Sequence, residues 1–255
     1  MYGKSGLKQD LASMGITSGD TLLVHASMKS IGPVEGGADT VLDALSETLR
    51  DGLLCLPAHT WSNINAENPL FEQDKTPVCV GVLPELFRKR PGVFRTLHPT
   101  HSLSLLGRDA AAFGAGEEKK ETPCAPDSCY GRLARRGAKV LLIGVDFSRN
   151  TLLHCVEEIA DVPGRITESY EPLMVRTAQG TVFSVPSRRH IGSVSENYVV
   201  LEPVLRHRGI LRDVHFGGAR CMLCEVRPMF DAALELLGKN IRLFNDRTPV
   251  PRAWY

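Results

Sequence analysis

Hydrophobic and polar residues alternate with two different periods along the first two thirds of the chain. Short aliphatic runs have the length and composition of buried strands, and they lie at residues 21–25, 53–57, 103–106 and 140–145. Apolar residues recur at helical spacing before and between these runs, at residues 5–14, 38–50, 81–90, 110–113 and 130–136. This order predicts an α/β fold with a central, mostly parallel sheet flanked by helices.

The pattern changes near residue 165. Two strand-like segments at 173–176 and 181–185 flank a Gly-containing turn and predict a hairpin. A helix near 196–206, a strand pair within 210–226 and a helix at 229–237 are expected to follow. The C-terminal part is therefore expected to be α+β with antiparallel strands. Because no segment resembles a linker, residues 1–255 are predicted to form a single domain, with a possible subdomain change near 165.

Residues 61–78 are polar and show little periodicity. A structureless stretch of this length is uncommon inside a compact domain unless it serves a function. The segment is predicted to be a functional loop or lid.

Composition and charge exclude several classes of function. A net charge of +1 gives no electrostatic case for binding nucleic acid or membranes. No run approaches the about eighteen apolar residues of a spanning helix, and the N-terminus has no apolar signal region, so the protein is expected to be cytoplasmic. Seven scattered cysteines favour reduced thiols. Cys221 and Cys224 lie in a strand-like run and point to opposite faces, so no metal site is expected. The sequence does not indicate an oligomeric state.

His154 is the strongest candidate for chemistry. It follows the apolar run 140–145 and polar cap residues, which predicts a position in the first turn of a helix at the carboxyl end of a central strand. Open α/β sheets build their sites there. Glu157 lies on the same helical face, and a carboxylate beside histidine stabilises the imidazolium that a general base becomes. The alternative is a histidine packed in the core.

Two loops add candidate binding residues. Residues 25–32, followed by Gly36 and Gly37, contain serines, a lysine and free backbone N–H groups that suit a phosphate, although an ordinary Gly-containing loop remains the alternative. They match neither a Walker loop nor a G-x-G-x-x-G fingerprint. Residues 95–102 hold two histidines, two threonines and a serine, which favours a binding loop for pantetheine or phosphate over a zinc site. The remaining histidines are expected on the surface or in packing: His59, His190, His207 and His215.

These three segments, in this order, resemble the aminoglycoside 3-N-acetyltransferase family. The resemblance runs from about residue 5 to 237, and it is carried by residues 18–25, 29–32, 36–38, 76–77, 81–88, 98–102 and 150–154 together with Glu157. The chain departs from the family pattern at Ala26, where many members have serine, and at Cys129, which follows Ser128 where proline is common.

The resemblance implies acetyl transfer from acetyl-CoA to a small-molecule amine, on an α/β fold distinct from the GNAT acetyltransferases and without a metal. It also implies a coenzyme A crevice lined by His25, Ala26, Ser27, Lys29, Ser30, Ile31, Gly32, Thr100 and Ser102. His154 corresponds to the family's catalytic histidine and would act as general base for the amine. Glu157 would orient His154, and Thr151 is a candidate donor to the oxyanion.

A polycationic aminoglycoside calls for an acidic pocket, for which Glu67, Asp74 and Asp127 are the candidates, beside Glu72 and Glu121. The near-neutral charge gives no long-range steering of a polycation. Two alternatives remain. One is a hydrolase pairing His154 with a Ser or Cys nucleophile, although no G-x-S-x-G motif supports it. The other is a non-catalytic coenzyme A-binding protein.

Overall fold

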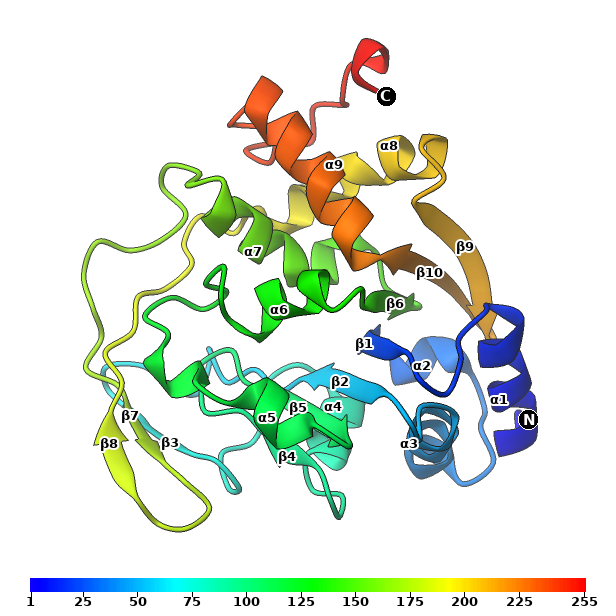
Figure 1. Cartoon of the computed structure of the whole chain (residues 1–255), viewed down its shortest axis with the longest axis horizontal. Coiled ribbons are helices and arrows are strands. Elements are labelled where there is room, and N and C mark those ends of the chain that lie inside the picture. The colour runs from blue at the N-terminus through cyan, green and yellow to red at the C-terminus, as the bar shows by residue number, and fades with distance from the viewer.

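A seven-stranded mixed sheet organises the computed structural model, which describes residues 1–255 (Figure 1). In spatial order the strands are β4 (Phe94–Arg95), β5 (Leu103–Gly107), β2 (Leu53–Pro57), β1 (Thr21–Ala26), β6 (Lys139–Ile143), β10 (Ala219–Glu225) and β9 (Leu211–Phe216). The α/β fold class is confirmed, as are the antiparallel strands of the C-terminal part.

Parallel pairing is confined to the centre of the sheet, where β1 lies between β2 and β6. The strands on both flanks pair antiparallel, so the sheet is less parallel than the alternating pattern predicts. Two of these antiparallel pairs, β4–β5 and β9–β10, are joined by short connections, as antiparallel neighbours allow. Gly217 and Gly218 join β9 to β10, and a Cβ atom on Gly217 would lie 2.9 Å from Ile31.

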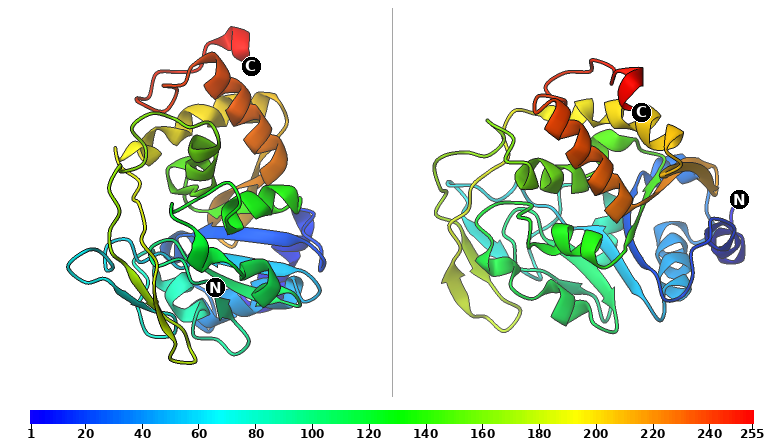
Figure 2. Two further views of the ribbon diagram at one scale, coloured as in Figure 1. Left: turned by 60° about the vertical axis from the view of Figure 1, so that its left-hand side comes forward. Right: turned by 45° about the horizontal axis from the view of Figure 1, so that its top comes forward.

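Helices cover both faces of the sheet (Figure 2). One face packs against α1 (Lys4–Ser13), α2 (Met28–Ile31), α3 (Gly37–Thr48) and α4 (Val82–Phe87). The other packs against α5 (Ala110–Gly114), α6 (Cys129–Arg135), α7 (Leu152–Ile159), α8 (Glu202–His207) and α9 (Val226–Lys239). Single-turn 3₁₀ helices occur at Glu117–Lys119, Phe147–Arg149 and Arg252–Trp254. No helix is both long and apolar enough to span a membrane.

The two cores divide the residues of each strand between them. In β1, Leu22 and Val24 enter one core and Leu23 the other, as expected from side chains that alternate across a strand. Cys221 and Cys224 likewise enter opposite cores, and all seven cysteines are free. The predicted free thiols and the opposite orientation of Cys221 and Cys224 are confirmed.

A second, three-stranded sheet consists of β3 (Leu70–Glu72), β7 (Met174–Arg176) and β8 (Val182–Ser184). The predicted hairpin is β7–β8. The polar segment 61–78 is not structureless, because it contains β3, which pairs in parallel with β7. Buried Arg95 joins this sheet to the main one by donating to the carbonyl oxygens of Thr76 at 2.6 Å and Ala58 at 2.9 Å. The subdomain change near residue 165 stays a prediction.

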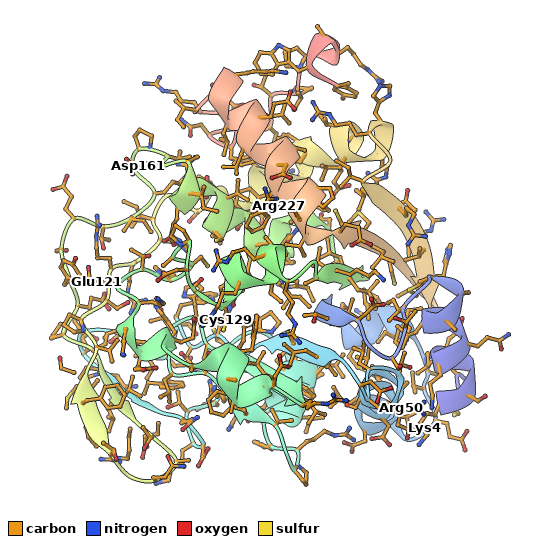
Figure 3. The ribbon with its side chains drawn as sticks, in the orientation of Figure 1. Lys4, Arg50, Glu121, Cys129, Asp161 and Arg227 are labelled. Carbon is orange, nitrogen blue, oxygen red and sulfur yellow. The ribbon has the colours of Figure 1, made fainter.

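Two further local differences have clear causes. The helix predicted at 196–206 is a 3₁₀ stretch, Val194–Leu201, followed by α8, which has a proline in its first turn. Cys129 lies buried at the start of α6 (Figure 3), and its backbone N–H donates to Glu117 Oε1 at 2.8 Å. Proline would lack this N–H, so the departure from the family pattern at Cys129 supports a local hydrogen bond.

Candidate active site

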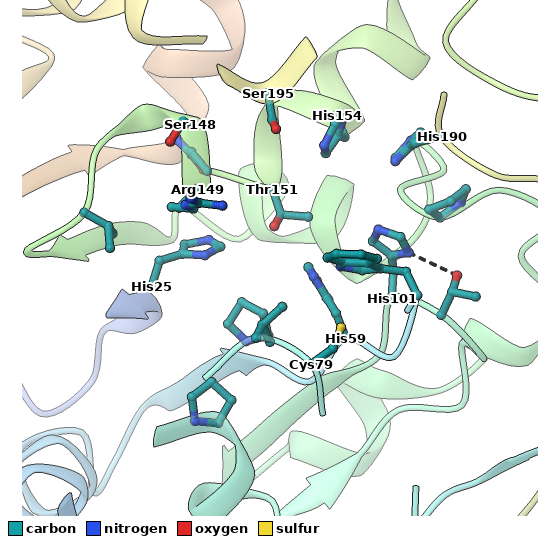
Figure 4. Close-up of a pocket in the computed structure, with 18 of the residues that line it drawn as sticks. His25, His59, Cys79, His101, Ser148, Arg149, Thr151, His154, His190 and Ser195 are labelled. Carbon is teal, nitrogen blue, oxygen red and sulfur yellow. Dashed lines mark hydrogen bonds between the residues drawn. The ribbon is translucent and has the colours of Figure 1, made fainter. Parts of the chain in front are cut away.

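A cavity of about 650 Å³ opens where the central parallel strands end (Figure 4). Its walls come from the carboxyl ends of β1 and β2, the turn after β6, the start of α7 and residues 189–195. This is the edge at which α/β sheets place their sites. Five of the eight histidines of the chain line the cavity: His25, His59, His101, His154 and His190.

His154 is held by a hydrogen-bonded chain. Its Nδ1 lies 2.7 Å from the hydroxyl of Tyr198, which donates to Glu157 Oε2 at 2.5 Å. An ionised carboxylate only accepts, so the single hydroxyl proton of Tyr198 points to Glu157. Tyr198 must then accept from His154 Nδ1–H. The neutral His154 ring is thereby fixed in the tautomer whose Nε2 carries the lone pair.

Glu157 is buried, with 1% of its surface exposed, and lies 3.5 Å from His154 Nδ1. Arg165 Nε donates to its other oxygen at 2.6 Å. Burial acts to raise the pKa of Glu157, but the neighbouring His154 and the hydrogen bonds from Tyr198 and Arg165 outweigh it and hold the pKa below its ordinary value. The carboxylate therefore stays charged behind the histidine, and Tyr198 is the link that the sequence did not indicate.

A second histidine–carboxylate pair stands beside the first. His190 Nε2 lies 2.7 Å from Glu158 Oε1, and the His190 ring stacks on His154 with centroids 4.3 Å apart. Burial lowers the pKa of His190, assisted by His154 and opposed by Glu158. The expectation that His190 is a surface or packing residue is therefore wrong, because it belongs to the cavity wall.

His59, expected on the surface or in packing, also lines the cavity. Its Nε2 lies 2.7 Å from the Tyr130 hydroxyl, and burial lowers its pKa well below the ordinary value. Neither His59 nor His190 has an aspartate or glutamate three or four residues away in the sequence, so the spacing that marks His154 and Glu157 is missing there. His207 and His215 are exposed and lie outside the cavity, as expected.

The expected coenzyme A residues divide into two groups. His25, Ala26 and Thr100 line the cavity, and burial lowers the pKa of His25 to about 3. The residues that do not line it are Ser27, Lys29, Ser30, Ile31, Gly32 and Ser102. Ile31 lies in the core, and Ser102 is fully buried, donating to the carbonyl oxygen of Ala58 at 2.8 Å.

Thr151 lines the cavity directly before α7. Its backbone carbonyl accepts from the His154 N–H at 3.1 Å, whereas its hydroxyl has no partner within the protein. Cys155 points elsewhere, since its thiol is buried in the core and donates to the carbonyl oxygen of Ala125. The structure thus brings Thr151 to the cavity with His154 and provides no cysteine nucleophile next to that histidine in sequence.

The three candidate acidic residues lie elsewhere. Glu67 and Asp74 are exposed in turns on either side of β3, and Asp127 pairs with Lys120 at the surface. None of them lines the cavity, whose walls contain no aspartate or glutamate. The charged residues of the walls are Arg149 and Arg189.

One group of side chains could hold a metal ion. Cys124, Glu158 and His190 bring three ligand atoms within 4.8 Å of one another. The oxygens of Glu158 also accept from the backbone N–H of Cys124 at 2.8 Å and from the Thr122 hydroxyl. These bonds account for the arrangement as a hydrogen-bonded network around His190.

Comparison with known proteins agrees with this geometry. The aminoglycoside 3-N-acetyltransferase family model matches residues 23–238. Aminoglycoside N(3)-acetyltransferase VII of Streptomyces paromomycinus is 34% identical over 191 residues, which are 68% of this chain and 66% of that protein. Aminoglycoside N(3)-acetyltransferase IX of Micromonospora chalcea is 29% identical over 267 residues, 94% of each chain.

Solved structures show the same fold. A histidine-to-alanine variant of the aminoglycoside acetyltransferase AAC(3)-IVa in complex with a gentamicin is 26% identical, with a TM-score of 0.83 over 95% of this chain and 91% of that chain. AAC-IIIb in a binary complex with CoASH is 25% identical, with a TM-score of 0.82 over 98% and 99%. The chain therefore belongs to the aminoglycoside 3-N-acetyltransferase family of enzymes.

Proposed function

We propose that the protein transfers the acetyl group of acetyl-CoA to an amine of an aminoglycoside or a similar amino compound, with His154 as general base. The observation that carries this proposal is the Tyr198–Glu157 chain, which leaves the Nε2 lone pair of His154 available in a cavity at the carboxyl end of β1 and β6. The relatives that hold CoASH or gentamicin support a coenzyme A thioester as the donor and an amino compound as the acceptor.

The chemistry follows from the protonation states. An alkylamine is mostly an ammonium at neutral pH, and it must lose a proton before nitrogen can attack the thioester. His154 Nε2 accepts that proton, and Glu157 stabilises the resulting imidazolium directly and through Tyr198. The C–N bond forms and the C–S bond breaks. The imidazolium proton passes to the departing thiolate, and the second proton that the attacking nitrogen loses is released to solvent.

Donors near His154 are available for the oxyanion of the tetrahedral intermediate. The Thr151 hydroxyl has no other partner, which supports its role as a donor. On the coenzyme side, His25, Ala26 and Thr100 would contact acetyl-CoA. Arg149 has an exposed guanidinium without an internal partner, as a residue that binds phosphate requires.

The test follows free thiol release from acetyl-CoA in the presence of a panel of amines. We expect release that depends on the amine, and a loss of about 10²–10⁴-fold in kcat/KM for His154→Ala, because general base catalysis has that magnitude. His207→Ala, which changes an exposed histidine outside the cavity, is the matched control.

Near-normal transfer by a folded His154→Ala protein would contradict the role of His154. Thiol release without an amine would favour a hydrolase. Coenzyme A binding without release would favour a non-catalytic binding protein.

A further inference from the structure

We propose that the acceptor of this site is a monoamine whose other groups are neutral or anionic, and that polycationic aminoglycosides are poor acceptors. This acceptor class presupposes the acetyl transfer proposed above and narrows its substrate. It stands on the charges that line the cavity and on those that lie directly behind its walls.

The walls of the cavity offer no negative charge. They contain no aspartate or glutamate, and their two formally charged residues are Arg149 and Arg189. Arg189 is neutralised by Glu171 at 2.7 Å, whereas Arg149 has no partner. Each ammonium that leaves water needs an anionic or equivalent partner. A molecule with several ammonium groups therefore finds no carboxylate among the residues that line the cavity.

The two carboxylates behind the cavity walls, Glu157 and Glu158, already accept hydrogen bonds from protein groups. Glu157 accepts from Tyr198 and Arg165, and it is 1% exposed. Glu158 accepts from His190, from Thr122 and from the backbone of Cys124, and its side chain is 5% exposed. An incoming ammonium can reach neither carboxylate without displacing the histidine in front of it.

The imidazoles of the walls suit hydroxyl groups better than ammonium groups. Burial keeps the pKa of His25, His59 and His101 below the ordinary value, so these rings are neutral near pH 7. His59 and His101 each have one ring nitrogen bonded to a protein hydroxyl, and the other nitrogen of a neutral ring can pair with a hydroxyl of the ligand. An amine that carries hydroxyl or anionic groups has partners here, and a second ammonium has none of opposite charge.

A buried positive charge next to the cavity reinforces this preference. Arg95 donates to the carbonyl oxygens of Ala58 and Thr76 and to Ser102, with no carboxylate partner. Burial lowers its pKa to about 9, so it remains charged near neutral pH. Its partners Ala58 and Ser102 adjoin the cavity residues His59 and His101 in the sequence.

The first experiment compares acceptors and measures binding. Thiol release is followed with glucosamine, glucosamine 6-phosphate and the polycations gentamicin and sisomicin, and gentamicin is also titrated calorimetrically into the full chain with and without coenzyme A. We expect at least about tenfold higher kcat/KM for a monoamine and no saturable gentamicin binding at micromolar concentrations.

A higher kcat/KM for gentamicin or sisomicin, or micromolar gentamicin binding, would overturn the acceptor class while upholding acetyl transfer. The absence of thiol release with every amine would instead overturn the proposed function.

A second experiment supplies the missing charge. Ser195 lines the cavity in the same region as Thr151 and His154 (Figure 4). Ser195→Asp is expected to raise kcat/KM for sisomicin about tenfold over Ser195→Asn, which has the same size without the charge. Equal values for the two variants would contradict the view that a missing carboxylate limits the use of polycations.

Discussion

A single hydroxyl group determines which nitrogen of the catalytic candidate faces the cavity. Tyr198 must give its only proton to Glu157, so it accepts from His154 Nδ1 and leaves Nε2 unprotonated. The direct His154–Glu157 contact of 3.5 Å is too long for a good hydrogen bond, so it cannot fix the tautomer of His154 by itself. Tyr198 is therefore a positioning residue, and its effect on His154 can be measured.

We expect Tyr198→Phe to lower kcat/KM by about 10–100-fold, because hydrogen bonds to charged groups contribute about 1.5–3 kcal/mol. KM for acetyl-CoA should stay within about twofold, since Tyr198 does not line the cavity. Steady-state kinetics with varied acetyl-CoA give both values. Tyr170→Phe, which removes an exposed hydroxyl bonded to Glu121, is the control. Equal kcat/KM for Tyr198→Phe and the native protein would contradict the positioning role.

At the residue scale, the sequence predicts a contact between site residues only where the two residues are also close in the chain. His154 and Glu157 are three residues apart on one helix, a spacing that puts them on one face. Tyr198 is 44 residues from His154, and His190 is 32 residues from Glu158. Tertiary packing alone brings these pairs together, so no periodicity in the sequence could reveal them.

At the scale of elements, Arg189 joins two segments of the cavity wall. Its guanidinium donates to the backbone carbonyl of Trp61 at 2.9 Å and to that of Ile64, and Trp61 also lines the cavity. The segment 61–78, expected to be a functional loop or lid, is thus tied at its start to residues 189–195. Its role as a lid stays a prediction.

We expect Arg189→Met to raise the hydrogen-exchange rates of backbone amides in residues 61–64 and 189–195 together, because the variant removes the bonds that join them. Amides of the central strands β1 and β6 should keep their protection. Mass spectrometry of peptides from both segments measures this. Arg188→Met is the control, since that guanidinium donates to Thr167 instead. Faster exchange in only one of the two segments would contradict the coupling.

Elements formed by distant pairing were also the ones that the sequence missed. β3 has three residues, too few to show an alternation within a polar stretch, and its partner β7 lies about a hundred residues further along the chain. The helices and strands around the central sheet are longer and amphipathic, so their hydrophobic periodicity is sufficient to predict them. A hydrophobic pattern does not record the direction in which neighbouring strands pair, so the antiparallel pairs on both flanks of the sheet could not be derived from it.

At the scale of the whole molecule, buried neutral histidines make stability depend on pH. Burial lowers the pKa of His25 to about 3 and of His98 to about 4, from an ordinary value of 6.5. Between pH 6.5 and 4 the unfolded chain therefore binds protons that the folded protein does not. The free energy of unfolding must fall as the pH falls through this window.

Replacing one buried histidine should reduce the slope of the free energy of unfolding against pH. His98 Nδ1 accepts from the backbone N–H groups of Thr100 and His101, and an asparagine oxygen can take over this role. We expect His98→Asn to lower the slope of unfolding free energy against pH by about 1.4 kcal/mol per pH unit between pH 6 and 4.5. Urea denaturation at several pH values measures the slope. His215→Asn, on the exposed face of β9, is the control, and an unchanged slope for His98→Asn would contradict the prediction.

The chain of contacts behind His154 also sets when the site can form during synthesis. Arg165, which holds Glu157, donates to Asn245 at 2.7 Å, and the Tyr198 ring packs against Phe244 with centroids 5.0 Å apart. Phe244 and Asn245 are translated after all strands of both sheets. A nascent chain can therefore pair its sheet before His154 is oriented, so the proposed acetyl transfer should begin only after Phe244 and Asn245 have left the ribosome.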